Sequence, residues 1–274
     1  MRQDAPTVNT QKVLYAIAAE LKLKPPRLAA KPKYRVSAKS PGWGDLIEVC
    51  APDNSNLKRI SLEYKGVSVA SVTEDMDFLD RSTVEQVKER IFRAPGTSVH
   101  GSLPCTVWCL RQAQNVAMHG EPYAKRLEAR RKIARRLLAH FIEVAELALT
   151  MGGQVSFEWP RHNYGWLLPE LISFITRHGL IEANVDGCAV GMKNAQGKSI
   201  LKKWRFVTSS ARLASGLIDL RCQHPPGFKH AEYQGGHDTV KTAFYPDRLC
   251  SCLLYTSDAA DEGLGVDLGG RRII

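Results

Sequence analysis

The sequence predicts an α/β protein with a mostly parallel sheet and helices on both faces. Short apolar runs bounded by turn residues alternate with longer segments of helical periodicity, which is the pattern of this fold class. No apolar run approaches the roughly 18 residues of a membrane helix, and the first residues lack the apolar core of a signal peptide. The cysteines are scattered without a framework spacing, which predicts a reducing, intracellular location in the cytoplasm or nucleus.

Six segments are expected to form the strands. Residues 45–50 are an apolar run between Gly42-Trp43-Gly44 and the turn residues 52–54. The third segment follows the Pro95-Gly96 turn and leads towards a cysteine. The six expected ranges are 45–50, 67–73, 97–100, 154–157, 181–190 and 201–208.

Four helices are expected between or after these strands. Ser82 and Glu85 have the spacing of a capping box and predict a helix from residue 82 to about residue 92. Residues 123–151 carry apolar residues at helical spacing until two glycines stop the pattern. The other two helices are expected at 166–178 and 210–217.

Three segments lie outside the α/β domain expected at residues 41–220. Residues 1–40 carry nine Lys or Arg against two acidic residues, together with prolines, and are expected to form a basic arm. Residues 221–251 are irregular and rich in His, Gly and Pro. Residues 252–274 resemble translated sequencing-library adapter, so we expect the native chain to differ beyond Ser251 and residues 221–251 to belong to a truncated segment.

The chain is basic, with 38 Lys or Arg, 28 Asp or Glu and a net charge of +10. Such an excess indicates a polyanionic partner, so we expect nucleic acid, either DNA or RNA, and no membrane. The helix expected at 123–151 carries seven basic residues in its first half. They form either a solvated helix face or a track for phosphate groups.

A thiol and a carboxylate are expected to meet at one edge of the sheet. Cys105 follows the third strand in Gly101-Ser102-Leu103-Pro104-Cys105, and Glu158 ends the fourth in Phe157-Glu158-Trp159-Pro160. Ligands of open α/β sheets bind outside the carboxyl ends of the strands, so both residues are candidates for one site. The structural alternatives are a buried, inert Cys105 and a Glu158 that caps a loop or pairs with Arg161.

The order of these motifs resembles that of class I S-adenosylmethionine-dependent methyltransferases, and among them the cytosine C5 methyltransferases. The resemblance covers roughly residues 45–210, with a first-strand turn, an acidic end to the second strand, a Pro-Cys loop, a Glu loop and an Arg-containing element at 202–207. It implies a Rossmann-like sheet, S-adenosylmethionine as cofactor and methyl transfer to nucleic acid. The chain also resembles regions of retroelement-like polyproteins.

The resemblance implies roles for individual residues. Cys105 would be the nucleophile that adds to C6 of a flipped-out cytosine, Glu158 the partner of ring N3, and Arg205 a supporting cation. The residues expected to contact the cofactor are Glu48, Asp53, Glu74, Asp77 and Pro104.

Two departures from the family favour an alternative function. The turn after the first strand, residues 49–54, contains no glycine, and Pro52 removes a backbone donor there. The Glu loop continues with Trp159-Pro160, where the family has Asn. The alternative is a non-catalytic methyltransferase-like module that binds nucleic acid within a larger mobile-element-type polyprotein.

Thiols and imidazoles after residue 221 suit zinc. They belong to Cys222, His224, His230, His237 and Cys250. Their spacing matches none of the usual paired zinc motifs, so a polar loop without metal is the alternative. If Cys222, His224 and His230 bind zinc, we expect a structural ion, because the segment has little apolar content.

Overall fold

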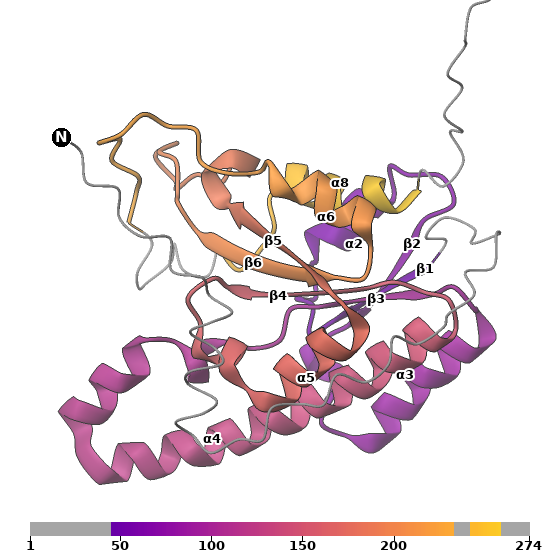
Figure 1. Ribbon diagram of the computed structural model, residues 1–274, viewed down its shortest axis with the longest axis horizontal. Coiled ribbons are helices and arrows are strands. Elements are labelled where there is room, and N and C mark those ends of the chain that lie inside the picture. Colours follow the sequence, from indigo (N-terminus) through magenta and orange to yellow (C-terminus); the bar gives the residue numbers. More distant parts are fainter. Residues whose placement is uncertain (1–44, 233–241, 259–274) are drawn as a thin grey trace, which may run out of the picture.

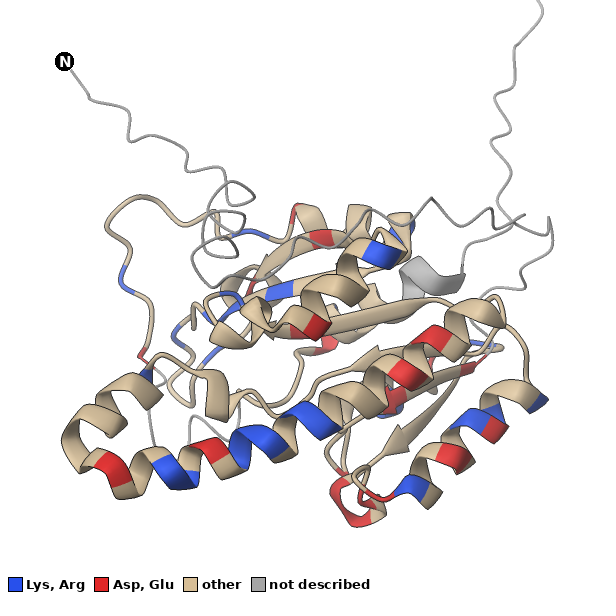
Figure 2. Cartoon of the chain, turned by 60° about the horizontal axis from the view of Figure 1, so that its bottom comes forward, with Lys and Arg blue, Asp and Glu red and all other residues tan. Residues whose placement is uncertain are grey.

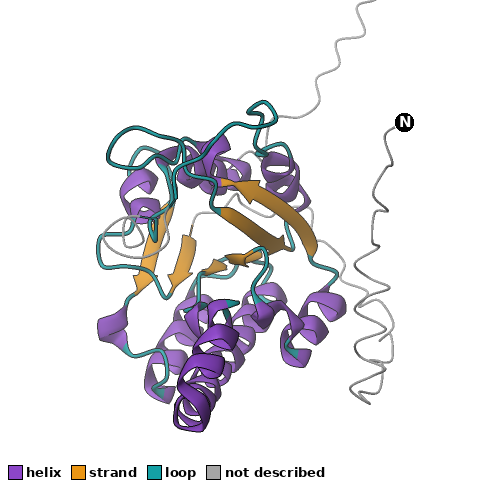
Figure 3. Cartoon of the chain, turned by 90° about the vertical axis from the view of Figure 1, so that its left-hand side faces the viewer, coloured by secondary structure: helices purple, strands orange, loops and turns teal. Residues whose placement is uncertain are grey.

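A computed structural model describes residues 45–232 and 242–258 of the chain. These residues form an α/β fold in which a six-stranded, mostly parallel sheet lies between two layers of helices (Figures 1 and 3). The predicted fold class is confirmed at this level. The basic arm at 1–40 and His237 lie outside the described residues. No helix of the described part of the chain is long and apolar enough to cross a membrane.

The elements follow one another in an alternating order. The strands are β1 (Asp45–Val49), β2 (Ser68–Val72), β3 (Ser98–Gly101), β4 (Val155–Pro160), β5 (Ile181–Asp186) and β6 (Lys203–Thr208). The α-helices are α2 (Asn56–Ser61), α3 (Arg81–Arg93), α4 (Arg111–Thr150), α5 (Pro169–His178), α6 (Ala211–Ile218) and α8 (Asp247–Asp258). Short 3₁₀ helices are η1 (Glu74–Met76), η2 (Thr106–Trp108), η3 (Tyr164–Leu167) and η4 (Gly187–Val190).

The strand order across the sheet is β2-β1-β3-β4-β6-β5. The pairs β1–β2, β1–β3 and β3–β4 are parallel, whereas β6 is antiparallel to both of its neighbours. From β1 the chain moves outwards to β2 and then returns to the other side of β1 as β3. The order therefore reverses between β1 and β3, and the carboxyl ends of β1 to β5 share one edge.

The two faces of the sheet have separate cores. We call them the α4 face, covered by α3, α4 and α5, and the α8 face, covered by α2, α6 and α8 (Figure 1). Alternate residues of each strand point to opposite faces. In β1, for example, Leu46 packs in the core of the α8 face and Ile47 in that of the α4 face.

The long helix α4 is bent where Gly120 takes a left-handed φ of 63°, which a glycine adopts without strain. Its second part matches the helix predicted from residue 123 and buries Leu138 and Phe141 against the sheet. Phe141 lies so close to β3 that a Cβ on Gly101 would be 2.4 Å from its ring. The predicted helix therefore forms the main support of the α4 face.

Several element boundaries differ from the predictions. The N-cap of α3 is Asp80, whose side chain accepts from the Ser82 N–H, so the expected start at Ser82 is wrong by two residues. At the other end of the domain, Ser210 caps α6 as predicted. The helices α2 and α8 were not predicted, because α2 is short and α8 extends into residues 252–274, which resemble translated adapter. Helix α8 runs across residue 252, and Leu253 and Leu254 are buried within it.

Candidate functional site

Glu158 is the centre of a buried polar cluster on the α8 face. Its Oε1 accepts hydrogen bonds from Ser102 Oγ at 2.8 Å and from Tyr245 Oη at 3.0 Å. Burial raises the pKa of Glu158 and so favours the protonated acid. Since Oε1 already accepts twice, the acid proton belongs on Oε2. That atom is buried and has no hydrogen-bond partner among the described residues.

His100 extends this cluster towards the middle of the sheet. Its Nδ1 lies 2.7 Å from Ser156 Oγ and its Nε2 lies 3.0 Å from Tyr245 Oη. Burial lowers the pKa of His100 to about 4, so the ring is neutral near pH 7. Because Tyr245 donates to Glu158, the tautomer that fits has Nε2–H donating to Tyr245 and Nδ1 accepting from Ser156.

Cys105 lies at the start of η2, beside the cluster and partly buried. Asn163 Nδ2 fixes its backbone by donating to the Cys105 carbonyl at 3.0 Å. Burial, with a further contribution from Glu158, raises the pKa of the thiol to about 11, whereas Lys202 acts to lower it. The structure thus brings Cys105 near Glu158 as expected. It holds the thiol protonated, however, which is the opposite of an activated nucleophile.

The expected role of Arg205 as a supporting cation is wrong, because the structure does not bring this residue to Glu158. In the β4–β6 pair, Arg205 lies opposite Trp159 and therefore points to the α4 face. There its guanidinium stacks on Trp166 at 4.4 Å and pairs with Glu182 at 2.6 Å.

Lys202 is the cation that lies near the thiol and the carboxyl. It interacts electrostatically with both Glu158 and Cys105, and its Nζ donates to the Thr242 carbonyl at 2.6 Å. Strand β6 runs against the others, so the residue just before it reaches the edge where the other strands end. Lys202 lies three positions before Arg205 in the same predicted element. It was missed because the sequence does not reveal the direction of the strand and therefore which of its ends reaches this edge.

Of the five residues expected to contact a cofactor, one is buried and four are exposed. Glu48 is only 2% exposed and accepts from Ser55 Oγ at 2.5 Å, and burial raises its pKa to about 7. Glu48 is therefore an interior residue, and its predicted cofactor contact is corrected. The exposed ones are Asp53, Glu74, Asp77 and Pro104, which lie in the segments that follow β1, β2 and β3.

The turn after β1 has an unusual backbone in place of the missing glycine. Cys50 adopts a φ of 59°, a left-handed conformation that is uncommon for a residue with a side chain. The neighbouring Ala51 N–H donates to the Val72 carbonyl and ties this turn to β2. Such local strain occurs often at functional sites.

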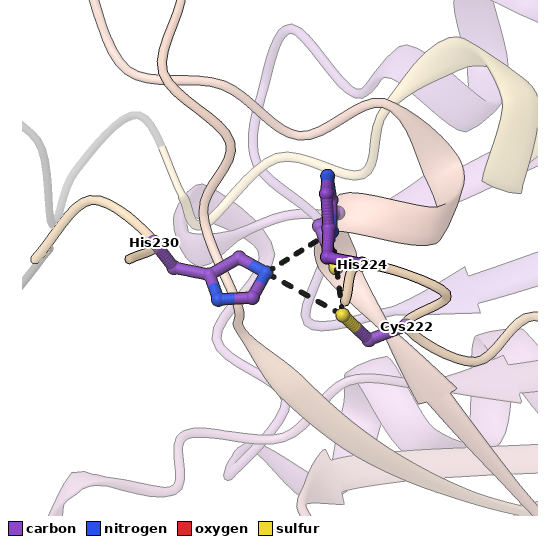
Figure 4. A group of neighbouring side chains, drawn as sticks. Cys222, His224 and His230 are labelled. Atoms are coloured by element: carbon purple, nitrogen blue, oxygen red, sulfur yellow. Dashed lines mark hydrogen bonds between the residues drawn. The ribbon is translucent and has the colours of Figure 1, made fainter. Parts of the chain in front are cut away.

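A second cluster lies after the carboxyl end of β5. The structure brings together Cys222, His224 and His230, as the sequence suggested (Figure 4). It adds Cys188 of η4 to this group. Cys250 is not part of it, since this residue is fully buried in α8 and its thiol faces the Tyr245 carbonyl. Cys188 was missed because it lies 34 positions before Cys222, and only the fold makes them neighbours.

Exposed basic residues follow the outer side of α4 (Figure 2). Arg130 lines a pocket together with Pro104 and Val107 of the loop that carries Cys105. Arg131 lies over the ring of Trp108 in the same loop, at 5.4 Å. The basic row therefore passes beside the loop that carries Cys105.

Comparisons of the chain with protein-family models, with curated proteins and with solved structures give no match. What the chain does is therefore inferred from its strand order and from the chemistry of these side chains.

Proposed function

We propose that the chain is an S-adenosylmethionine-dependent methyltransferase that acts on nucleic acid by cytosine C5-type chemistry. The observation that carries this proposal is the state of Glu158 beside Cys105. Its Oε2 is buried without a hydrogen-bond partner among the described residues, and burial raises the pKa of Glu158, which favours a proton on that atom. A ring nitrogen such as N3 of cytosine would satisfy that donor, at the carboxyl edge where α/β sheets bind ligands.

The strand order supports a Rossmann-like methyltransferase sheet. Ligands of such sheets bind where the strand order reverses, which here lies between the carboxyl ends of β1 and β3. The parallel strands β1 to β4, with helices on both faces, also agree with the mostly parallel sheet that the resemblance implies. A cofactor bound at that reversal would lie next to Ser102 and Cys105, which follow β3.

The loops at this edge fit the cofactor in part. An exposed carboxylate after the second strand can hold ribose hydroxyls, and Glu74 and Asp77 are exposed there. The left-handed turn at Cys50 supplies the backbone conformation that a glycine would otherwise provide. Against the fit, Pro52 offers no N–H in the same turn. The cofactor would supply an electrophilic methyl group.

The protein's own residues would prepare the base. Cys105 Sγ, as thiolate, would add to C6 while the Glu158 O–H donates to N3, so that electron density moves to C5. C5 would then take the methyl group from the cofactor's sulfonium sulfur, which leaves as a neutral thioether. Loss of the C5 proton to water, return of the N3 proton to Glu158 and elimination of the Cys105 thiolate would restore the ring and the free enzyme.

Two changes must precede this reaction. Cys105 must lose its proton, and Lys202 is the nearby cation that favours the thiolate. In addition, Glu158 Oε2 is shielded from solvent, so a flipped base reaches it only if the surrounding residues rearrange. The exposed basic row of α4 would hold the phosphate backbone beside the site.

Calorimetric titration of the full chain with S-adenosylmethionine tests the cofactor step. We expect saturable binding with one site per chain. Transfer of a labelled methyl group to DNA and RNA then tests the reaction, and Cys105→Ala should reduce it on the order of 10³-fold or more. Cys109→Ala, which removes a neighbouring partly buried thiol, is the matched control and should retain activity. Transfer that survives in Cys105→Ala would exclude the C5 mechanism.

The high pKa of Cys105 favours a second candidate, a non-catalytic module that binds nucleic acid. This module needs neither a thiolate nor the cofactor, only the basic surface. It predicts that well-folded chain binds no S-adenosylmethionine, while its affinity for DNA or RNA falls steeply with salt. Salt-insensitive binding would argue against this module.

A further inference from the structure

Four metal-ligating side chains converge next to the carboxyl end of β5. Cys188 comes from η4, whereas Cys222, His224 and His230 come from the segment that follows α6. One ligand atom from each residue lies within 4.8 Å of all the others. Figure 4 shows the last three with their sulfur and nitrogen atoms directed at one another. Two pieces of chain that are distant in sequence thus supply a complete Cys₂His₂ set.

The spacing of these atoms matches a coordination sphere. Cys222 Sγ lies 3.3 Å from His224 Nδ1 and 3.5 Å from His230 Nε2, and the two nitrogens are 3.3 Å apart. Around tetrahedral zinc, with Zn–S of about 2.3 Å and Zn–N of about 2.0–2.1 Å, the N–N edges are about 3.3–3.4 Å and the S–N edges about 3.5 Å. The three atoms therefore occupy one face of such a tetrahedron.

Hydrogen bonding alone explains this triangle poorly. A neutral histidine has one N–H and a cysteine one S–H, and each proton points along a single direction. To explain all three contacts by hydrogen bonds, each of the three protons would have to lie between a different pair of these atoms with good geometry. A central cation instead satisfies all the ligand atoms at once.

We propose that Cys188, Cys222, His224 and His230 bind one Zn²⁺ ion in a closed tetrahedral site. Two thiolates with two imidazoles are a typical ligand set for structural zinc, and four protein ligands leave no position for substrate. Binding would release the two thiol protons to solvent. The site is independent of the methyltransferase proposal, because a structural ion requires neither the cofactor nor nucleic acid.

Groups around the four ligands already orient them. Asp186 Oδ2 accepts from the Cys222 N–H at 3.0 Å and from Arg221 Nε at 3.2 Å, while its Oδ1 accepts from Arg161 at 2.7 Å. The His224 ring stacks on Phe228 with centroids 3.9 Å apart. Such outer contacts commonly hold metal ligands in place.

The ion would fasten a weakly structured segment to the sheet. Residues 219–232 contain no helix or strand, and Ala231 makes only an isolated bridge to Ile200. Arg161 follows β4, so the contacts through Asp186 also join the Glu158 strand to the cluster. Zinc would stabilise this side of the molecule by replacing the core that the segment lacks.

Metal analysis of the full chain, purified without chelators, tests the site. We expect about one zinc per chain by mass spectrometry, and a cobalt-substituted chain with the visible absorption of tetrahedral thiolate coordination. Cys222→Ser and Cys188→Ser should each lose the metal and the spectrum. Cys109→Ser, a cysteine outside the cluster, is the control and should keep both.

Two further measurements guard against variants that do not fold. His224→Cys keeps four ligands and should retain metal with a shifted cobalt spectrum, whereas His224→Ala should lose it. Removing zinc from the unaltered chain should lower its melting temperature, and added zinc should restore it. A folded chain that takes up neither zinc nor cobalt would overturn the proposal. Full stoichiometry and an unchanged spectrum in Cys188→Ser would exclude the four-ligand site.

Discussion

The two faces of the sheet differ in kind, although the same strands build both. Strand β4 sends Val155, Phe157 and Trp159 to the α4 face, and Ser156 and Glu158 to the α8 face. The first three pack into a continuous aromatic and aliphatic core. The other two take part in the buried hydrogen-bond cluster. One strand thus contributes apolar side chains to the core on one face and polar side chains to the hydrogen-bond cluster on the other.

Polar residues on the α8 face form a row across the sheet. In register, Ser71 lies beside Glu48, Glu48 beside His100, His100 beside Ser156, and Ser156 beside Thr208. Burying polar groups is unfavourable unless they are hydrogen-bonded. Elements outside the sheet supply partners, as Ser55 of the α2 N-cap does for Glu48. The stability of the α8 face therefore depends on hydrogen-bond partners from outside the sheet, whereas the stability of the α4 face depends on close packing of apolar side chains.

The largest expected effect is on the α4 face. Phe141→Ala should lower the free energy of unfolding by about 3–5 kcal/mol, because Phe141 is fully buried and its removal leaves a cavity beneath β3. Denaturant titration measures the change. Phe92→Ala is the control, since Phe92 on α3 is 58% exposed and its loss should change little. Equal effects of the two substitutions would mean that the α4 face is not the main core.

Glu48 and His100 should give the α8 face two opposing pH dependences. Burial raises the pKa of Glu48 to about 7, so its contribution is full below about pH 4.5 and is lost as the pH rises through 7. Burial lowers the pKa of His100 to about 4, so its contribution is full above about pH 6.5 and is lost as the pH falls through 4. Each amounts to about 3 kcal/mol over its range.

Single substitutions should separate the two pH dependences of stability. Relative to the unaltered chain, Glu48→Gln should gain about 3 kcal/mol of stability between about pH 4.5 and pH 8, because it cannot ionise. His100→Gln should gain a similar amount as the pH falls from about 6.5 to 4. Urea titrations across this range measure both, with exposed Glu128→Gln as the control. Differences that stay constant with pH would show that neither group titrates in the folded state as described.

The α4 face was largely predictable from sequence, and the reason is periodicity. Residues such as Leu138, Phe141 and Val144 repeat at helical spacing, and the pattern reports directly which side of the helix is buried. The ends of β3 and β4 were also predictable, since turn residues and a change in polarity mark them. Cys105 and Glu158 were therefore placed at the correct edge.

The partners on the α8 face were not predictable, because they depend on strand direction and on contacts between distant segments. Lys202 replaces Arg205 near Glu158 only because β6 is antiparallel, and no local pattern distinguishes the two directions. Tyr245 lies 87 positions from Glu158, in a segment that reads as irregular. Cys188 likewise joins Cys222 only after β5 and β6 are paired. Local signals identify strands and helices, whereas tertiary packing assembles the polar sites.

The smallest expected effect tests whether Tyr245 holds the polar face together. Tyr245→Phe removes a hydroxyl that donates to Glu158 and accepts from His100. Glu158 Oε1 keeps the bond from Ser102, but the His100 Nε2–H loses its acceptor in a buried place. We expect a loss of about 1–2 kcal/mol, the usual cost of one unsatisfied buried donor. Denaturant titration measures it, with Tyr64→Phe, a partly buried tyrosine outside the cluster, as control.

A double-mutant cycle makes this last test specific. The hydroxyl of Tyr245 acts on Glu158 and His100 together, so combining Tyr245→Phe with His100→Leu, which has no hydrogen-bond donor, should give less than the sum of the two losses. The non-additivity should be about 1 kcal/mol, because the second substitution removes the donor that the first leaves unpaired. Additive losses would mean that the hydroxyl bonds weakly to His100. The polar cluster would then depend on its other hydrogen bonds, such as those from Ser102 to Glu158 and between His100 and Ser156, and Tyr245 would not join its two halves.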